Sequence, residues 1–210
     1  MHPHSPPAWH EILDHHAARL RSAAPAPAPL PTNPGPLDAA TPFLLHRRLH
    51  APGHITPPKS PAPDAALWWA LHTDTLNADL VLRASSDQAA RAPLLRRDVY
   101  DTIEVWTEGE LCALHALWRH AEREHRPDWM DRVFSAISWH LEHTQPDNAT
   151  NRPWCIAPFV HFADAVNSPD ALHYAQTLLH NAAAGPASAT ILIAEILKDA
   201  ADMLRPSHTP

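Results

Sequence analysis

Two cysteines and a histidine have the types and the spacing of a metal site. Cys112 and His115 are three residues apart in a predicted helix, so their side chains share one face. Cys155 lies next to the position that an internal repeat, described below, pairs with Cys112. Two thiolates and one imidazole would leave one position of a zinc ion open, as in catalytic zinc sites. Alternatively, both cysteines are small buried apolar side chains and His115 is a hydrogen-bonded core histidine.

The segment HLEH, followed by an aspartate, contains a second candidate set. His140 and His143 are three residues apart, and Asp147 could reach back from the following loop. Two imidazoles and a carboxylate suit a divalent metal ion. The alternative is that both histidines interact with the free carbonyls and the dipole of a helix C-terminus, without any metal. Outside the loop that carries His143 and Asp147, the candidate metal ligands of the two sets are Cys112, His115, Cys155 and His140.

The polar loop at residues 143–152 is the segment that we expect to face a ligand. It precedes a predicted helix, whose N-terminal N–H groups could hold an anion together with Arg152. In stacked hairpins such loops line one rim. The structural alternative is that Asn and Thr side chains cap the next helix while Asp147 closes an Asx turn. The candidate ligand-binding residues are His143, Gln145, Asp147, Asn148, Asn151, Arg152 and Trp154.

Composition excludes several classes of function. The 210-residue chain has 16 basic and 23 acidic residues, and its net charge of −7 disfavours a nucleic-acid partner. With only 4 glycines it has no GxGxxG, no phosphate-binding loop and no GxSxG elbow. No apolar run is long enough to span a bilayer, so we expect no membrane partner. Because two cysteines make no disulfide framework and no signal peptide is visible, we expect a cytoplasmic location.

Apolar periodicity predicts helices throughout residues 63–206. The spacing predicts helices over 64–83, 107–124, from Pro127 to the HLEH segment, from Pro153, from Pro169 to Gly185, and over 187–204. Thr107 and Glu110 form a T-x-x-E capping box at the start of the second of these helices. Proline is predicted at the first position of the three helices that follow, where its missing N–H costs nothing.

The first 62 residues have a different character. They are rich in proline, which fixes φ and removes a donor, and this favours an extended arm with short helices at 8–22 and about 37–50. Of the 8 tryptophans, Trp68, Trp118 and Trp129 fall on apolar stripes and are predicted in the core. Trp9 and Trp69 are instead candidates for exposed interface anchors.

An internal repeat is visible in the second half of the chain. The dipeptide Pro127-Asp128 recurs as Pro169-Asp170, and the same offset of about 42 residues relates the apolar stripes of the flanking helices. Two helices per unit at this period are typical of stacked αα-hairpins. Neighbouring hairpins are then expected to bury each other's apolar faces.

The predicted hairpins over 107–204 resemble the αα-hairpin repeats of the α/α-toroid superfamily. The resemblance lies in the segments WTEGELCALHALW and HLEHTQPDNATNRPW, covers about half of the chain and is architectural. The superfamily includes terpenoid cyclases, lanthionine cyclases and six-hairpin glycosidases. The Trp154-Cys155 pair is similar to the Trp-Cys that precedes a zinc-ligand cysteine in lanthionine cyclases. The accompanying Gly and Cys-His-Gly are absent, as are the DDxxD and DxDD motifs of terpenoid cyclases, so no catalytic residue is carried over.

These patterns predict an all-α protein. We expect an array of stacked antiparallel αα-hairpins over 63–206, a partial α/α-toroid or solenoid, after a Pro-rich arm at 1–62. The leading functional hypothesis is a non-catalytic helical module that binds another protein or its own copies, without a cofactor. The alternative is an α/α-toroid-like enzyme, a metal-dependent hydrolase or lyase, whose site is the rim at 143–152. Zinc is the cofactor in that alternative.

Overall fold

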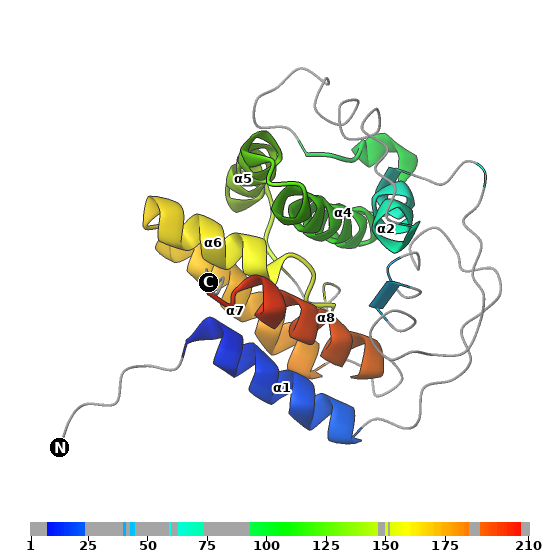
Figure 1. Cartoon of the computed structure of the whole chain (residues 1–210). Helices are drawn as coiled ribbons and strands as arrows, with labels where there is room; N and C mark the ends of the chain where they lie inside the picture. The colour runs from blue at the N-terminus through cyan, green and yellow to red at the C-terminus, as the bar shows by residue number, and fades with distance from the viewer. Residues whose placement is uncertain are drawn as a thin grey trace.

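The computed structural model describes residues 8–23, 40, 43–44, 59, 63–73, 93–146, 150, 152–184 and 190–206. Within these ranges the chain forms seven α-helices, one 3-10 turn and no strand, which confirms the all-α class (Figure 1). None of the described helices is both long enough and apolar enough to cross a membrane. The elements are α1 (Trp9–Ala23), α2 (Pro63–Thr73), η3 (Arg97–Val99), α4 (Ile103–Arg123), α5 (Pro127–His143), α6 (Ile156–Val166), α7 (Pro169–Ala184) and α8 (Thr190–Met203).

Helix α6 lies at the centre of the packing. It contacts α4, α5, α7 and α8, while α4 also packs against α2 and α5. Figure 1 shows α2, α4 and α5 on one side of the molecule and α1 beside α8 on the other. The core is continuous across these helices, and its largest fully buried side chains include Trp68, Trp106, Trp154 and Phe159.

Helix α1 belongs to the Pro-rich N-terminal segment, yet it packs along α8. Leu13 and Ala17 are buried between the two helices. Arg21 donates from Nε to Glu195 Oε1 at 2.9 Å, and Asp14 pairs with Lys198 at 3.1 Å. Because the later residue of α1 meets the earlier residue of α8, the two helices run antiparallel. Ala40, Phe43 and Leu44 are also buried in the core, and the remainder of the predicted 37–50 helix lies outside the described residues.

The prolines open helices at two of the three predicted positions. Helices α5 and α7 begin at Pro127 and Pro169, and Ser168 Oγ accepts a hydrogen bond from the N–H of Ala171 at 3.2 Å. The prediction for Pro153 is wrong, because α6 begins at Ile156. Its N-cap residue, Cys155, has a left-handed backbone with φ 65°, which bends the chain into the helix.

Helix α4 begins one turn earlier than the predicted capping box. Its N-cap is Thr102, whose Oγ1 accepts a hydrogen bond from the N–H of Val105 at 3.3 Å. Thr107 and Glu110 lie inside the helix and are buried. The T-x-x-E pattern is therefore not a cap in this structure, and the Glu110 carboxylate is free to serve another segment.

Glu110 holds the segment at residues 93–95 instead. Its two carboxylate oxygens accept the backbone N–H groups of Leu94 and Leu95 at 2.6 and 2.7 Å. Trp106 Nε1 donates to the carbonyl of Leu95 at 3.1 Å, and Arg132 donates to the carbonyl of Pro93 at 3.1 Å. Helices α4 and α5 thus satisfy the backbone of a segment without secondary structure of its own, which removes the penalty for burying it.

The tryptophans divide differently from the prediction in one respect. Trp68, Trp118 and Trp129 are buried as predicted. Trp69 is only 5% exposed, so its predicted role as an exposed anchor is wrong. Residues 65–71 of α2 are buried on every face, and a helix of this kind has no outward side on which Trp69 could lie. Trp9 is half-buried and packs against the core.

Candidate functional site

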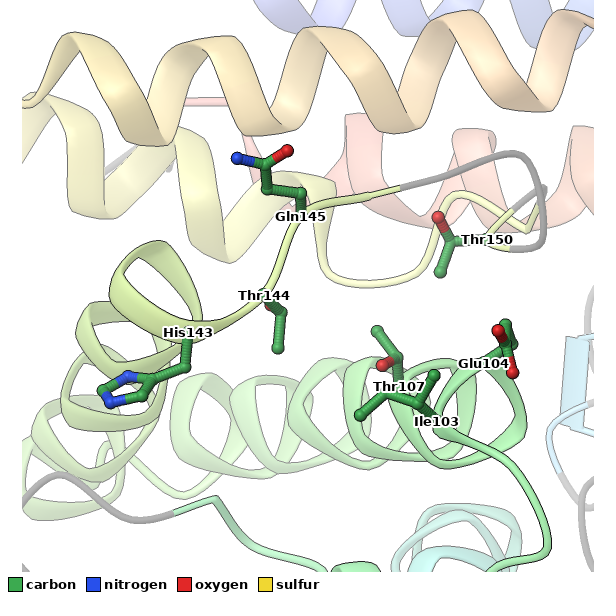
Figure 2. Close-up of a pocket in the computed structure, with 7 residues that line it drawn as sticks. All are labelled: Ile103, Glu104, Thr107, His143, Thr144, Gln145 and Thr150. Atoms are coloured by element: carbon green, nitrogen blue, oxygen red, sulfur yellow. The ribbon is translucent and has the colours of Figure 1, made fainter.

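The predicted rim contains a small polar pocket, here called the rim pocket. It lies where the N-terminus of α4 meets the C-terminus of α5, and its volume is about 180 Å³. Figure 2 shows Thr107 and Thr144 in the middle, with Glu104 and Thr150 on one side and His143 on the other. His143 and Gln145 are thus two predicted ligand-binding residues that line a real hollow. The pocket presents hydroxyl groups and one carboxylate, but it holds His143 and Glu104 apart.

The other predicted rim residues have different surroundings. Arg152 pairs with Glu108 of α4 at 3.0 Å, so its charge is already balanced in part. Trp154 is buried in the core rather than at the rim surface. Asp147, Asn148 and Asn151 lie outside the described residues. Ligand binding by this loop therefore stays a prediction, which applies best to the residues that line the rim pocket.

The two histidines of HLEH are separated by their environments. His140 is fully buried, stacks on Trp106 and shares a hydrogen bond of 2.9 Å between Nδ1 and Thr144 Oγ1. Its Nε2 has no hydrogen-bond partner among the described residues and lies 3.9 Å from a Glu110 oxygen. His143 is exposed, stacks on Trp139 and bonds the Trp139 carbonyl through Nδ1 at 2.9 Å. This carbonyl contact is the one expected of a histidine at a helix C-terminus.

The structure brings the backbone of Cys155 to His115. The N–H of Cys155 donates to His115 Nδ1 at 3.1 Å, and His115 Nε2 lies 3.1 Å from Asp199 Oδ2. An acceptor role for Nδ1 places the ring proton on Nε2, which donates to Asp199. Trp68 stacks on one face of the imidazole and donates from Nε1 to Cys112 Sγ at 3.0 Å. Both imidazole nitrogens are therefore engaged in hydrogen bonds that join α4, α8 and the start of α6.

Zinc binding by this set stays a prediction. Among the described residues, no group of three or more His, Cys, Asp or Glu side chains is arranged to hold a metal ion. Cys112, Cys155, His115 and Asp199 are all buried. Burial raises the pKa of the Cys155 thiol well above its ordinary value, and the nearby Glu110 and Cys112 raise it further. A neutral thiol is a poor metal ligand and a poor nucleophile.

Both cysteines should resist alkylation in the folded protein. Both thiols are buried and neither is in a disulfide, and the raised pKa keeps Cys155 protonated near neutral pH. Iodoacetamide at pH 7.5 should therefore modify them at least about tenfold more slowly than it does in denaturant, because it reacts with an accessible thiolate. Intact-mass spectrometry over time measures the two rates. Fast native modification of Cys155 would show that the interior opens readily.

A larger hollow, here called the end groove, lies at the opposite end of α4. Its volume is about 730 Å³, and α4, α5, α6 and the end of α8 contribute to it. From Thr107 to Glu122 the two hollows are separated by about 20 Å along the axis of α4, at 1.5 Å per residue. The apolar and aromatic side chains of its lining are Trp118, Met130, Phe134, His161, Ala165, Met203, Leu204 and Pro206.

An aromatic stack forms one wall of the end groove. Trp118 stacks on both Phe134 and His161, with ring centroids 5.4 and 5.0 Å away and near-parallel planes. His161 Nε2 contacts the Met203 carbonyl at 3.3 Å, and burial lowers the pKa of this imidazole. The stack thus joins α4, α5 and α6, and it is tied to the end of α8.

Glu122 is the ionisable group that distinguishes the end groove. Its Oε1 accepts the indole N–H of Trp118 at 2.8 Å. Burial raises the pKa of this carboxyl from 4.5 to about 7; Asp199 acts in the same direction, while Trp118 and Arg119 oppose it. A carboxyl that titrates near neutrality in a hollow is typical of functional sites. The sequence-based prediction missed it, although its spacing of four from Trp118 marks one helix face.

Replacing Glu122 with glutamine should change how stability depends on pH. Between pH 4.5 and about 7 the folded chain keeps a proton that the unfolded chain releases, so the native carboxyl lowers stability as pH rises. Relative to the wild type, Glu122→Gln should therefore gain up to about 3 kcal/mol across this window. Urea denaturation of both proteins at several pH values measures the difference. A constant difference would contradict the raised pKa.

The wild type must be compared with Glu122→Gln because His120 changes the pH dependence of stability in the opposite direction. Burial lowers the pKa of His120 from 6.5 to about 4, although its hydrogen bond to the Leu67 carbonyl opposes this shift. The unfolded chain then binds a proton that the folded chain does not, so this group makes stability rise between pH 4 and 6.5. The wild-type profile is thus a sum of opposing slopes, and only the difference isolates Glu122.

Comparison with known proteins gives no relative for this chain. No protein-family model matches it, and no match was found among curated proteins or solved structures.

Proposed function

We propose that this chain is a non-catalytic helical module that binds another protein, or a copy of itself, in the end groove. The proposal follows the leading hypothesis from the sequence and assigns a surface to it. As part of this proposal, α4 with α5 and α6 with α7 form successive hairpins of a stacked array. The groove opens at one end of that array. The supporting contacts are those between consecutive helices and between α4, α5 and α6.

The observation that carries the proposal is the size and chemistry of the end groove. Ligand sites are commonly 300–1,000 Å³ and mainly apolar, and the groove of about 730 Å³ lies within this range. The rim pocket, at about 180 Å³, is smaller than this. Two of the chain's 3 methionines, Met130 and Met203, line the groove. Methionine is flexible and polarisable, and it suits surfaces that adapt to a partner's side chains.

The polar interior supports a non-catalytic role. Glu110, His115 and Asp199 have the chemistry of catalytic groups, but all three are completely buried. Glu110 binds backbone N–H groups, and His115 with Asp199 links three helices. A substrate would have to displace these contacts in order to reach the reactive atoms. These groups are therefore better explained as parts of the fold.

The test is selection of ligands from a random peptide library on the immobilised chain. The selected peptides should shift the ¹³C-methyl signals of Met130 and Met203 in the labelled protein, because both side chains line the groove. Met130→Asp should weaken binding at least about tenfold by placing a charge in an apolar contact. Light scattering at rising concentration shows separately whether a copy of the chain is the partner.

Val166→Asp is the matched control. Val166 is an exposed apolar residue of α6 that is outside the groove lining, so the same substitution there should leave binding unchanged. Circular dichroism checks that both variants keep their helices. Peptides that shift neither methionine signal, or that bind the two variants equally, would exclude the end groove as the binding surface.

The rim pocket supports a second candidate function. It occupies the rim at which the α/α-toroid-like enzyme was predicted, and Glu104 and His143 line it. Elemental analysis of the purified chain tests this alternative directly. Stoichiometric zinc that is lost in His143→Ala or Cys112→Ala would favour a metal-dependent hydrolase or lyase over the binding module. A metal-free protein would remove zinc from the alternative.

A further inference from the structure

The end groove contains a carboxylate that has one oxygen bonded within the protein. Glu122 Oε1 accepts the indole N–H of Trp118, while Oε2 is not among the buried atoms that lack a partner in the described part of the chain and is open to the groove. The side chain is partly buried, and the indole fixes its position on the aromatic stack. Ionising a partly buried carboxyl costs free energy, and a cation that reaches the open oxygen offsets this cost.

The cations near Glu122 are already engaged by other carboxylates. Arg205 pairs with Asp14 and Asp202, and Arg119 Nε lies 3.4 Å from Asp199. His161 uses Nε2 for the Met203 carbonyl. Arg119 contributes at a distance, and its effect on the pKa of Glu122 is smaller than that of burial. The exposed ring of His125 is the remaining basic group of the lining, on the turn after α4.

Apolar side chains share the groove lining with the carboxylate, beside the charged residues Asp202 and Arg205. Met130 and Phe134 come from α5, and Met203 and Leu204 from the end of α8. Such walls suit the methylene stem of a long basic side chain, which buries its carbon atoms while its charged head seeks a partner. The chain as a whole carries a net charge of −7, which also attracts cations.

We propose that the end groove takes a lysine or arginine side chain of the partner protein, with the cationic head on Glu122 and the stem between Met130, Phe134 and Met203. The inference rests on the proposed function and specifies the chemistry of the partner segment: a basic residue flanked by apolar ones. An ammonium or guanidinium group supplies donors to Glu122 Oε2. Burial raises the pKa of Glu122, so the cation binds best above neutral pH, where the carboxyl is ionised.

The experiment uses hexylamine as the probe and hexanol as its uncharged counterpart. Hexylammonium remains protonated below about pH 10, as lysine does. At pH 8, titrations followed by the methyl signals of Met130 and Met203 should show hexylamine binding at least about tenfold more tightly than hexanol. In Glu122→Gln this ratio should fall to about twofold or less. Lowering the pH to 5 should weaken hexylamine binding to the wild type and leave hexanol unchanged.

Glu124→Gln is the control for net charge. Glu124 is an exposed carboxylate at the end of the same helix, so its substitution changes the total charge equally but should preserve the preference for hexylamine. Equal binding of hexylamine and hexanol to the wild type would overturn the inference, as would a preference that survives in Glu122→Gln. Selected peptides that lack basic residues but still shift the methionine signals would also overturn it, and they would leave the proposed binding function intact. Peptides that do not reach the groove at all would instead count against the proposed function.

Discussion

Replacing Glu110 with alanine should lower the free energy of unfolding by about 3–5 kcal/mol. The carboxylate accepts the N–H groups of Leu94 and Leu95 in the interior. Alanine would leave both N–H groups buried without an acceptor, and each such group costs about 1–3 kcal/mol. The contact from Trp106 to the Leu95 carbonyl would remain, so the segment would keep one of its hydrogen bonds to α4. Urea denaturation at pH 7 measures the loss.

Glu108→Ala is the matched control for this change. Glu108 lies on the same helix and pairs with Arg152 in a partly exposed position. Exposed ion pairs contribute about 0–1 kcal/mol, so this variant should differ little from the wild type. Similar losses in the two variants would show that Glu110 does not hold the 93–95 segment. Hydrogen exchange adds a local readout, because the Leu94 and Leu95 amides should lose protection in Glu110→Ala alone.

Replacing Asp199 with alanine should cost a similar amount, about 3–5 kcal/mol. Asp199 is completely buried and accepts a hydrogen bond from His115 Nε2, while Arg119 contributes its charge from 3.4 Å. Alanine would leave the imidazole N–H and the guanidinium without their acceptor. Because Trp68 and Trp154 pack on the imidazole, we also expect a change in the near-UV circular dichroism of the folded protein.

Asp202→Ala is the control that removes one negative charge from α8 without removing the interior contact of Asp199. Asp202 is three residues further along the same helix and pairs with Lys198 at 2.8 Å in a partly exposed position. Its loss should cost about 0–1 kcal/mol and leave the near-UV spectrum unchanged. If Asp199→Ala proves no less stable than Asp202→Ala, the link from α4 through His115 to α8 does not stabilise the fold.

Local signals were sufficient for much of the helical framework. Helices α5 and α7 begin at proline, which is favoured at the first helical position. Both starts could therefore be predicted without tertiary information. The structure also places the N–H of Cys155 on His115 Nδ1, while the repeat from which a nearby position was expected stays a prediction. The same kind of local signal failed at Thr107 and Glu110. There Glu110 accepts the backbone N–H groups of the 93–95 segment instead of capping the helix. This contact depends on a segment that α4 does not contain.

The exposure of single side chains depended on the tertiary structure. The sequence predicted Trp69 as an exposed anchor on a helix surface. Residues 65–71 of α2 are buried on all sides, so Trp69 belongs to the core. His140 and His143 have the same spacing as a ligand pair, yet packing buries one and exposes the other. Spacing along a helix fixes only the angle between two side chains. What lies opposite each of them is decided by the neighbouring helices.

By itself, then, the amino-acid sequence determined the helical class, the apolar stripes and several helix starts, because these follow from residues that are neighbours in the chain. Only the tertiary structure decided where the hollows lie and which ionisable groups face them. Glu122 illustrates the physical reason: its raised pKa comes from burial among α4 and the helices packed on it, and no single helix contains that environment. Trp118, Met130 and Met203 meet in the end groove from three different helices, so their common surface exists only after folding.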